Sequence, residues 1–141
     1  MSDSFDFSWM VGRTIIGVAL NEPTQWSFSF GPGVGIGAEC PWRLLKDGRV
    51  AISSEDHLQQ YGLPAPIDAA AVAAGTLASR AITHVEVKDG TADLVLEFAD
   101  GLRLEFLPIS SGYESWGVTT PSGFQVVAQG GGQLSGWRAG V

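Results

Sequence analysis

The sequence lacks the features that mark several classes of protein. Cys40 is its only cysteine, so no disulfide framework can form, and nothing indicates secretion. No apolar run approaches the roughly 20 residues of a membrane-spanning helix. The first residues are acidic, whereas a signal peptide begins with basic residues. These absences predict a cytoplasmic protein without a membrane partner.

Basic residues are few as well. The 8 Lys and Arg stand against 15 Asp and Glu, which gives a net charge of −7. Such a surface repels phosphate backbones, so we expect no nucleic-acid partner. The 2 histidines, His57 and His84, belong to no set of three or four ligands with the spacing of a zinc site. We therefore expect neither a metal nor a cofactor.

Motifs of nucleophilic catalysis and phosphate binding are also missing. No Gly-x-Ser-x-Gly elbow occurs. The glycines at 31, 33, 35 and 37 do not precede a helix, which argues against a phosphate-binding loop. Cys40 stands before Pro41 at the end of an apolar strand, a place typical of a buried, inert thiol.

What the sequence does contain is the material of a folded core. With 141 residues, 45% of them hydrophobic and 16% charged, the chain has the size and composition of one domain spanning 1–141. Short runs of alternating apolar and polar residues are separated by Gly, Pro and Asp-Gly turns, which predicts antiparallel hairpins. Small apolar residues recur at helical spacing only once, which predicts one packed helix.

The expected fold class is α+β, with two antiparallel meanders that form a curved sheet or an open barrel and one helix packed against it. The expected segments are an N-terminal arm (1–11), a first meander (12–53), the helix (66–79), a second meander (80–107), and a motif loop with a C-terminal hairpin (110–141). The arm is expected to attach loosely.

A weak internal repeat relates the two meanders. A shift of 68 residues places Trp26, Phe28 and Phe30 on Leu94, Leu96 and Phe98. Each meander is followed by a segment that carries a tryptophan, Trp42 in one half and Trp116 in the other. Duplication and convergent strand patterning both explain this similarity.

The polar and aromatic stretch 110–116 is the strongest candidate for a site. Tyr113, Glu114 and Trp116 on a loop that begins with glycine would form a recognition surface, because such aromatic residues anchor interfaces. A pair between Glu114 and Arg43 would bring Trp42 to the same place. The alternative is structural: Gly112 supplies a turn and both aromatic residues of the motif cap the core.

A second candidate lies in the irregular stretch 53–66, which is the longest in the chain. Glu55, Asp56 and His57 could serve as acid–base groups and, with Glu114, surround a pocket between sheet and helix. This arrangement would make the protein a small-molecule binder or a hydrolase. A hydrogen-bonded loop is the alternative interpretation.

Five segments carry a family resemblance. They are Val11-Gly12-Arg13-Thr14-Ile15, Cys40-Pro41-Trp42-Arg43-Leu44, Ser53-Ser54-Glu55-Asp56-His57, Gly62-Leu63-Pro64-Ala65-Pro66 and Ser110-Ser111-Gly112-Tyr113-Glu114-Ser115-Trp116. In these segments the chain resembles an uncharacterised family of small bacterial proteins, a domain of unknown function. The resemblance covers nearly the whole chain and implies a bacterial intracellular origin with no assigned activity. Small acidic proteins of this general kind are sometimes immunity factors for bacterial toxins, but no residue here carries that inference.

The leading functional hypothesis is a non-catalytic domain that binds another protein through the 110–116 loop, with the 53–66 loop as a second contact. It depends on the acidic charge, the aromatic residues on loops and the missing catalytic set. The alternative is the small-molecule binder or hydrolase described above. Self-association into a homodimer, through an edge strand or the N-terminal arm, is compatible with either.

Overall fold

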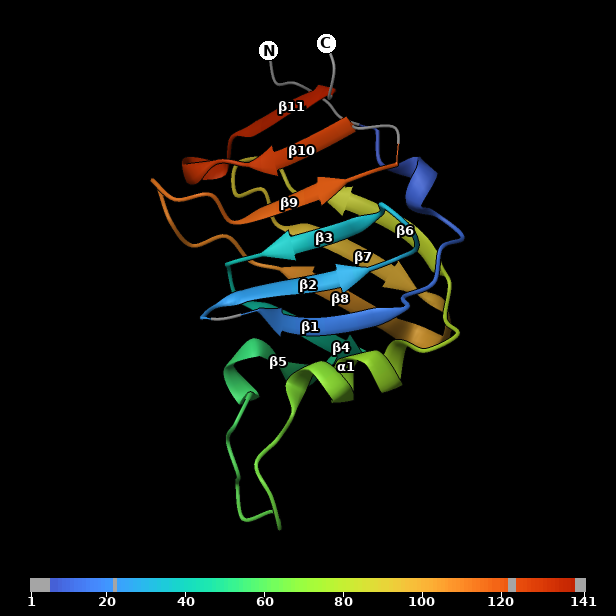
Figure 1. Ribbon diagram of the computed structural model, residues 1–141, viewed down its shortest axis with the longest axis vertical. Helices are drawn as coiled ribbons and strands as arrows, with labels where there is room; N and C mark the ends of the chain where they lie inside the picture. Colours follow the sequence, from blue (N-terminus) through green and yellow to red (C-terminus); the bar gives the residue numbers. More distant parts are fainter. Residues whose placement is uncertain (1–5, 22, 122–123, 139–141) are drawn as a thin grey trace.

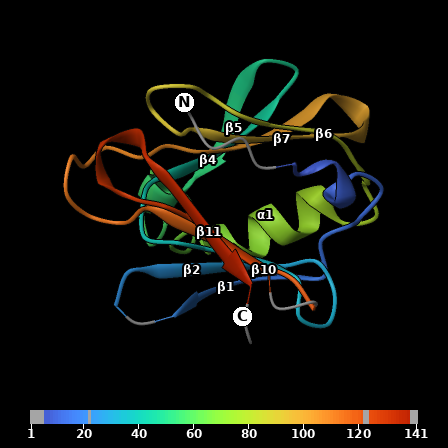
Figure 2. The ribbon, with the colours of Figure 1, turned by 90° about the horizontal axis from the view of Figure 1, so that it is seen from above.

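The computed structural model describes residues 6–21, 23–121 and 124–138, without the side chains of residues 124, 125, 137 and 138. Their backbone forms two antiparallel sheets that face each other (Figures 1 and 2). The first sheet has the order β1 (Gly17–Asn21), β2 (Gln25–Ser29), β3 (Gly35–Ala38), β9 (Trp116–Thr119), β10 (Phe124–Ala128) and β11 (Leu134–Arg138). The second has the order β5 (Arg49–Ser53), β4 (Trp42–Lys46), β8 (Leu102–Phe106), β7 (Leu94–Phe98) and β6 (Ile82–Val87).

Alternation along each strand directs the large apolar side chains into the space between the sheets. In β2, Trp26 and Phe28 are buried while Ser27 and Ser29 lie on the outer side. The ring of Phe28 makes edge-on contacts across the interface with Trp42 of β4 (centroids 5.3 Å apart) and Phe106 of β8 (5.1 Å). These perpendicular aromatic pairs join the two sheets at their centre.

The α+β class and the two antiparallel meanders are confirmed, and the meanders β1–β2–β3 and β6–β7–β8 lie in different sheets. After β3 the chain crosses over, so the β4–β5 hairpin extends the second meander beside β8. After β8 it crosses back, so β9 and β10 extend the first meander beside β3. Each half of the chain thus contributes strands to both sheets: the first half adds β4 and β5 to the second sheet, and the second half adds β9, β10 and β11 to the first. The weak sequence repeat has this topological counterpart.

One helix, α1 (Ala69–Leu77), closes the open end between the edge strands β1 and β5 (Figure 2). It is shorter than the predicted 66–79. Asp68 caps it by accepting a hydrogen bond from the Ala71 amide (3.1 Å), so Pro66 lies before the first turn rather than in it. No helix within the described residues is long and apolar enough to cross a membrane.

The N-terminal arm is attached more tightly than the sequence predicts. Residues 6–11 were expected to attach loosely, yet they contain a short 3-10 turn, η1 (Ser8–Met10), beside β6. Phe7 and Met10 are buried in the core. Phe7 contacts Trp116 edge-on at 6.3 Å between ring centroids. Phe7 and Met10 of the arm therefore belong to the core, while residues 1–5 lie outside the described chain.

Candidate functional site

Trp116, part of the predicted recognition motif, is a core residue. It is the first residue of β9 and only 2% exposed. Its indole Nε1–H donates a hydrogen bond to the Ala92 carbonyl oxygen (2.8 Å), so the polar edge of the ring is satisfied inside the protein. Trp42, at the start of β4, is buried as well and packs edge-on against Trp26 with 5.1 Å between ring centroids. Both tryptophans contribute to packing.

The loop before β9 is ordered by its own hydrogen bonds. Ser110 Oγ accepts bonds from the amides of Gly112 (3.0 Å) and Tyr113 (2.9 Å). The Ser110 carbonyl accepts a bond from the Gly131 amide (3.0 Å). A side chain at Gly130 would place its Cβ only 2.5 Å from the Gly112 backbone, so glycine alone permits this approach. The loop is therefore held in a fixed shape.

On this loop, Ile109 and Tyr113 are each 81% exposed. Large apolar side chains this exposed on an ordered loop are candidates for contact with a partner. The sequence motif includes Tyr113 but not Ile109, because a single apolar residue beside Pro108 gives no periodic signal.

A hollow of about 230 Å³ lies at the base of this loop, on the outer face of the first sheet. Its floor is formed at Gly37 and Gly117, cross-strand neighbours whose missing side chains leave the space open. Gln25, Glu39 and Glu114 are among its lining residues. This combination suits a side chain that is cationic or that donates hydrogen bonds.

Arg43 does not join this site. Its Nε donates to Glu105 Oε1 at 2.6 Å, on the outer face of the other sheet, where the expected pair with Glu114 is replaced by a cross-strand pair. Arg103 Nε lies 2.8 Å from the second oxygen of the same carboxylate. The buried Glu105 carboxylate is thus shared by two arginines, and β4 and β8 explain the pairing because their register places Arg43 opposite Glu105.

Glu55, Asp56 and His57 stabilise the 53–66 loop. Asp56 accepts hydrogen bonds from the Ser53 amide (2.9 Å) and the Tyr61 hydroxyl (2.9 Å). With Glu55 it lies in a 3-10 turn, η2 (Ser54–Asp56), which Ser53 caps.

His57 Nδ1 accepts a bond from the Ala69 amide (3.1 Å), so the neutral ring carries its proton on Nε2. Its ring packs edge-on against Trp26, with 5.3 Å between centroids. None of residues 55–57 lines the hollow that Glu114 borders. No three His, Cys, Asp or Glu side chains of the described chain gather closely enough to hold a metal ion.

Cys40 has the surroundings of an inert thiol. It is buried at the crossing between β3 and β4. Burial, opposed only in part by backbone hydrogen bonds, raises the pKa of the thiol from 9.0 to about 12. A thiol with this pKa holds its proton at neutral pH, so it is a poor nucleophile and a poor metal ligand.

Three large side chains of the 53–66 loop are exposed without a sequence signal of their own. Leu58 and Tyr61 are 68% and 67% exposed, and Leu63 is also exposed. In sequence these residues alternate irregularly with glutamine, glycine and proline, so no apolar pattern marks them. The available signal was the length of the irregular segment before α1.

The chain belongs to a family of unknown function, DUF6188, whose model matches residues 7–138. The match spans both meanders, both hairpin crossings and the two loops described above. No curated protein and no solved structure matches the chain.

Proposed function

We propose that the protein is a non-catalytic protein-binding domain whose contact surface is the ordered loop 107–114 with the adjoining hollow. The observation that carries this proposal is the exposure of Ile109 and Tyr113, 81% each, on a loop whose backbone is fixed by hydrogen bonds and glycine packing. A fixed loop loses little conformational entropy on binding, which favours affinity.

The hollow supplies specificity within this proposal. Glu39 and Glu114 border it, and the chain as a whole carries a net charge of −7. A basic partner would be attracted over a distance. A Lys or Arg side chain of that partner would enter the hollow and face the two carboxylates while Tyr113 and Ile109 contact apolar surface around it.

The test removes the exposed side chains and leaves the loop backbone unchanged. The protein is purified under native conditions from the cells that make it, and its complexes are weighed by native mass spectrometry. We expect a stoichiometric second polypeptide with the parent chain. The double variant Ile109→Ala, Tyr113→Ala should lose it, since an anchor residue of this kind contributes on the order of 2 kcal/mol, about 30-fold in Kd.

Val50→Ala is the matched control, because Val50 is an exposed apolar residue on β5 of the other sheet. It should retain the partner. Equal retention by the double variant and the control would refute the proposed surface. A chain that carries only a small added mass, unchanged in the double variant, would instead favour the small-molecule alternative.

A further inference from the structure

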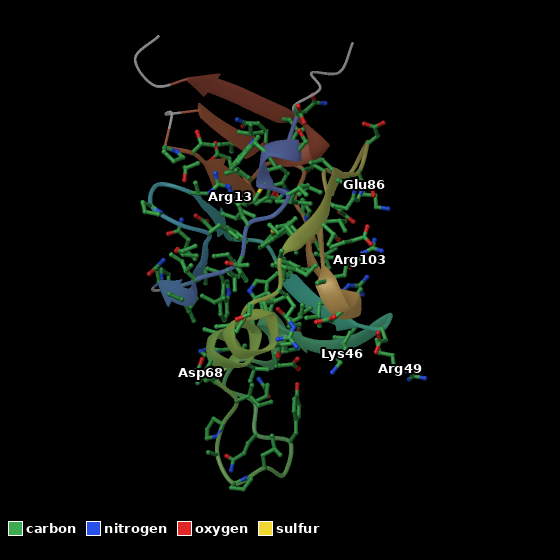
Figure 3. The ribbon with its side chains drawn as sticks, turned by 90° about the vertical axis from the view of Figure 1, so that its right-hand side faces the viewer. Arg13, Lys46, Arg49, Asp68, Glu86 and Arg103 are labelled. Atoms are coloured by element: carbon green, nitrogen blue, oxygen red, sulfur yellow. The ribbon has the colours of Figure 1, made fainter. Side chains whose placement is uncertain are left out.

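A second loop projects from the opposite part of the molecule. Residues 58–66 extend beyond α1 and away from both sheets (Figures 1 and 3). The two legs of this projecting loop are joined at its base by backbone bonds from Leu58 to Ile67 (2.8 Å) and from Ile67 to Gln59 (2.8 Å). At the tip, the Leu63 amide donates to the Gln60 carbonyl (2.7 Å) and the Gln60 side chain donates to the Leu63 carbonyl (2.8 Å). Hydrogen bonds, rather than burial, hold its shape.

The projecting loop directs apolar side chains into solvent at a cost in backbone energy. Leu58 and Tyr61 adopt left-handed backbone conformations, with φ of 67° and 45°. Such conformations cost about 1–3 kcal/mol each for residues other than glycine. Both side chains, and Leu63 between Gly62 and Pro64, remain exposed. The Tyr61 hydroxyl donates a hydrogen bond to Asp56 (2.9 Å), so folding gains one hydrogen bond here but little apolar burial.

The helix beside the projecting loop also lacks a polar outer face. None of the residues Ala69–Leu77 is charged. Ala69, Ala73 and Leu77 face the core, while Ala71, Val72 and Gly75 are exposed. Thr76 is the one polar residue of α1, and its hydroxyl donates to the Val72 carbonyl oxygen (2.8 Å). A helix that is apolar on nearly all sides is normally buried. The outer face of α1 is therefore a second apolar surface that no described residue of the chain covers, and it lies at the same end of the molecule as the loop (Figure 3).

Charge restricts what can cover these two surfaces. Residues 50–79 contain Glu55, Asp56 and Asp68 but no Lys or Arg. A second copy docked through the same surface would bring these acids together and be repelled. The complementary partner is a different protein with basic residues around an apolar groove.

We propose that the projecting loop and the outer face of α1 form one docking surface, and that its occupant is a different protein whose apolar groove is flanked by Lys and Arg. Leu58, Tyr61 and Leu63 enter the groove, and Val72 lies against its rim. Asp68 and Glu55 face the basic flanks. This surface is separate from the 107–114 loop and shares with the proposed function only the premise that the chain binds proteins.

Site-specific photocrosslinking in the cells that make the protein tests the proposal. Benzoylphenylalanine replaces Leu63 or Val72 in the full chain, one position at a time. Val11 is the control position because it is an exposed apolar residue beside η1, away from the loop. We expect the same crosslinked polypeptide from positions 63 and 72 and none from position 11.

Peptide mapping by mass spectrometry then locates the crosslinks on the partner. Support requires a contact site with apolar residues flanked by Lys or Arg, and at least a tenfold weaker crosslink when Tyr61→Ala is added. A crosslink to a second copy of this chain, an acidic contact site, or equal labelling at position 11 would overturn the proposal. Absence of any crosslink at 63 and 72 would overturn it as well.

A probe at Tyr113 distinguishes the two proposals. Crosslinking at 113 but not at 63 or 72 would refute the docking surface and leave the proposed function intact. The reverse result would refute the 107–114 surface alone. Melting curves of every substituted chain verify that the fold is retained.

Discussion

Replacing Trp116 separates the packing role of the 110–116 motif from its exposed part. The ring is 2% exposed, contacts Phe7, and donates its N–H to the Ala92 carbonyl. Trp116→Ala would open a cavity and leave that carbonyl without its partner. Core Trp→Ala changes cost about 3–5 kcal/mol. In a domain of this size that corresponds to a melting temperature lower by roughly 10–20 °C.

Trp116→Phe separates the loss of the hydrogen bond from the loss of apolar contact. Phenylalanine retains most of the apolar contact with Phe7 but cannot donate to Ala92. An unsatisfied buried carbonyl costs about 1–3 kcal/mol, so we expect an intermediate melting temperature, lower than that of the parent chain by roughly 5–10 °C. The comparison variant is Tyr113→Ala, which removes an exposed ring and should change stability by less than about 0.5 kcal/mol.

Differential scanning calorimetry on the three variants and the parent chain measures these effects. The expected order of melting temperatures is parent equal to Tyr113→Ala, then Trp116→Phe, then Trp116→Ala. If Trp116→Ala melts at the same temperature as the parent chain, the buried ring and its bond to Ala92 do not stabilise the fold. If Tyr113→Ala is as destabilised as Trp116→Ala, the loop is a structural element and its exposed residues lose their functional interpretation.

Three further changes test other parts of the structure. Burial raises the pKa of the Cys40 thiol from 9.0 to about 12. The contribution of this thiol to the free energy of unfolding is therefore complete below pH 9.0 and is lost as the pH rises toward 12. Urea titrations should show this decline, and Cys40→Ala should make it smaller; the pKa of Tyr61 is raised too, so part of the decline remains. Glu105→Gln should lower the free energy of unfolding, measured in urea, by roughly 1–2 kcal/mol. The loss is this small because the side chains of the two arginine partners are 43% and 38% exposed, and it should be smaller still in 1 M salt. Asp56→Ala should accelerate hydrogen exchange at the Ser53 amide without accelerating exchange in β7; equal acceleration in both would contradict a local role for Asp56.

The strands were predictable because each has a local signal. Trp26 and Phe28 alternate with serines, and Leu94, Leu96 and Phe98 recur at every second position, so the inward face of each strand follows from sequence alone. The burial of Val95 on the opposite face of β7 does not. The assignment of strands to two sheets was not predictable. β4 pairs with β8 across a separation of 62 residues between Arg43 and Glu105, and no nearby residue specifies that choice.

The same limit applies to the site. Tyr113 and Trp116 are three positions apart and equally aromatic, yet one is exposed and the other buried. The difference arises because β9 begins at Trp116, where pairing with β3 directs the side chain inward. The predicted pair of Glu114 with Arg43 is absent for a related reason, since β4 places Arg43 on the outside of the other sheet.

The lengths of the two connections between the sheets give an independent reason to propose a binding role for the 107–114 loop. The chain crosses between sheets twice at equivalent points, from β3 to β4 and from β8 to β9. The first crossing takes 3 residues, 39–41, and the second takes 9, 107–115. Because 3 residues suffice for the first connection, the 6 additional residues of the second are not needed to join the strands. Ile109 and Tyr113 lie within this longer connection, where the constraints of topology are weakest and loops commonly carry binding residues.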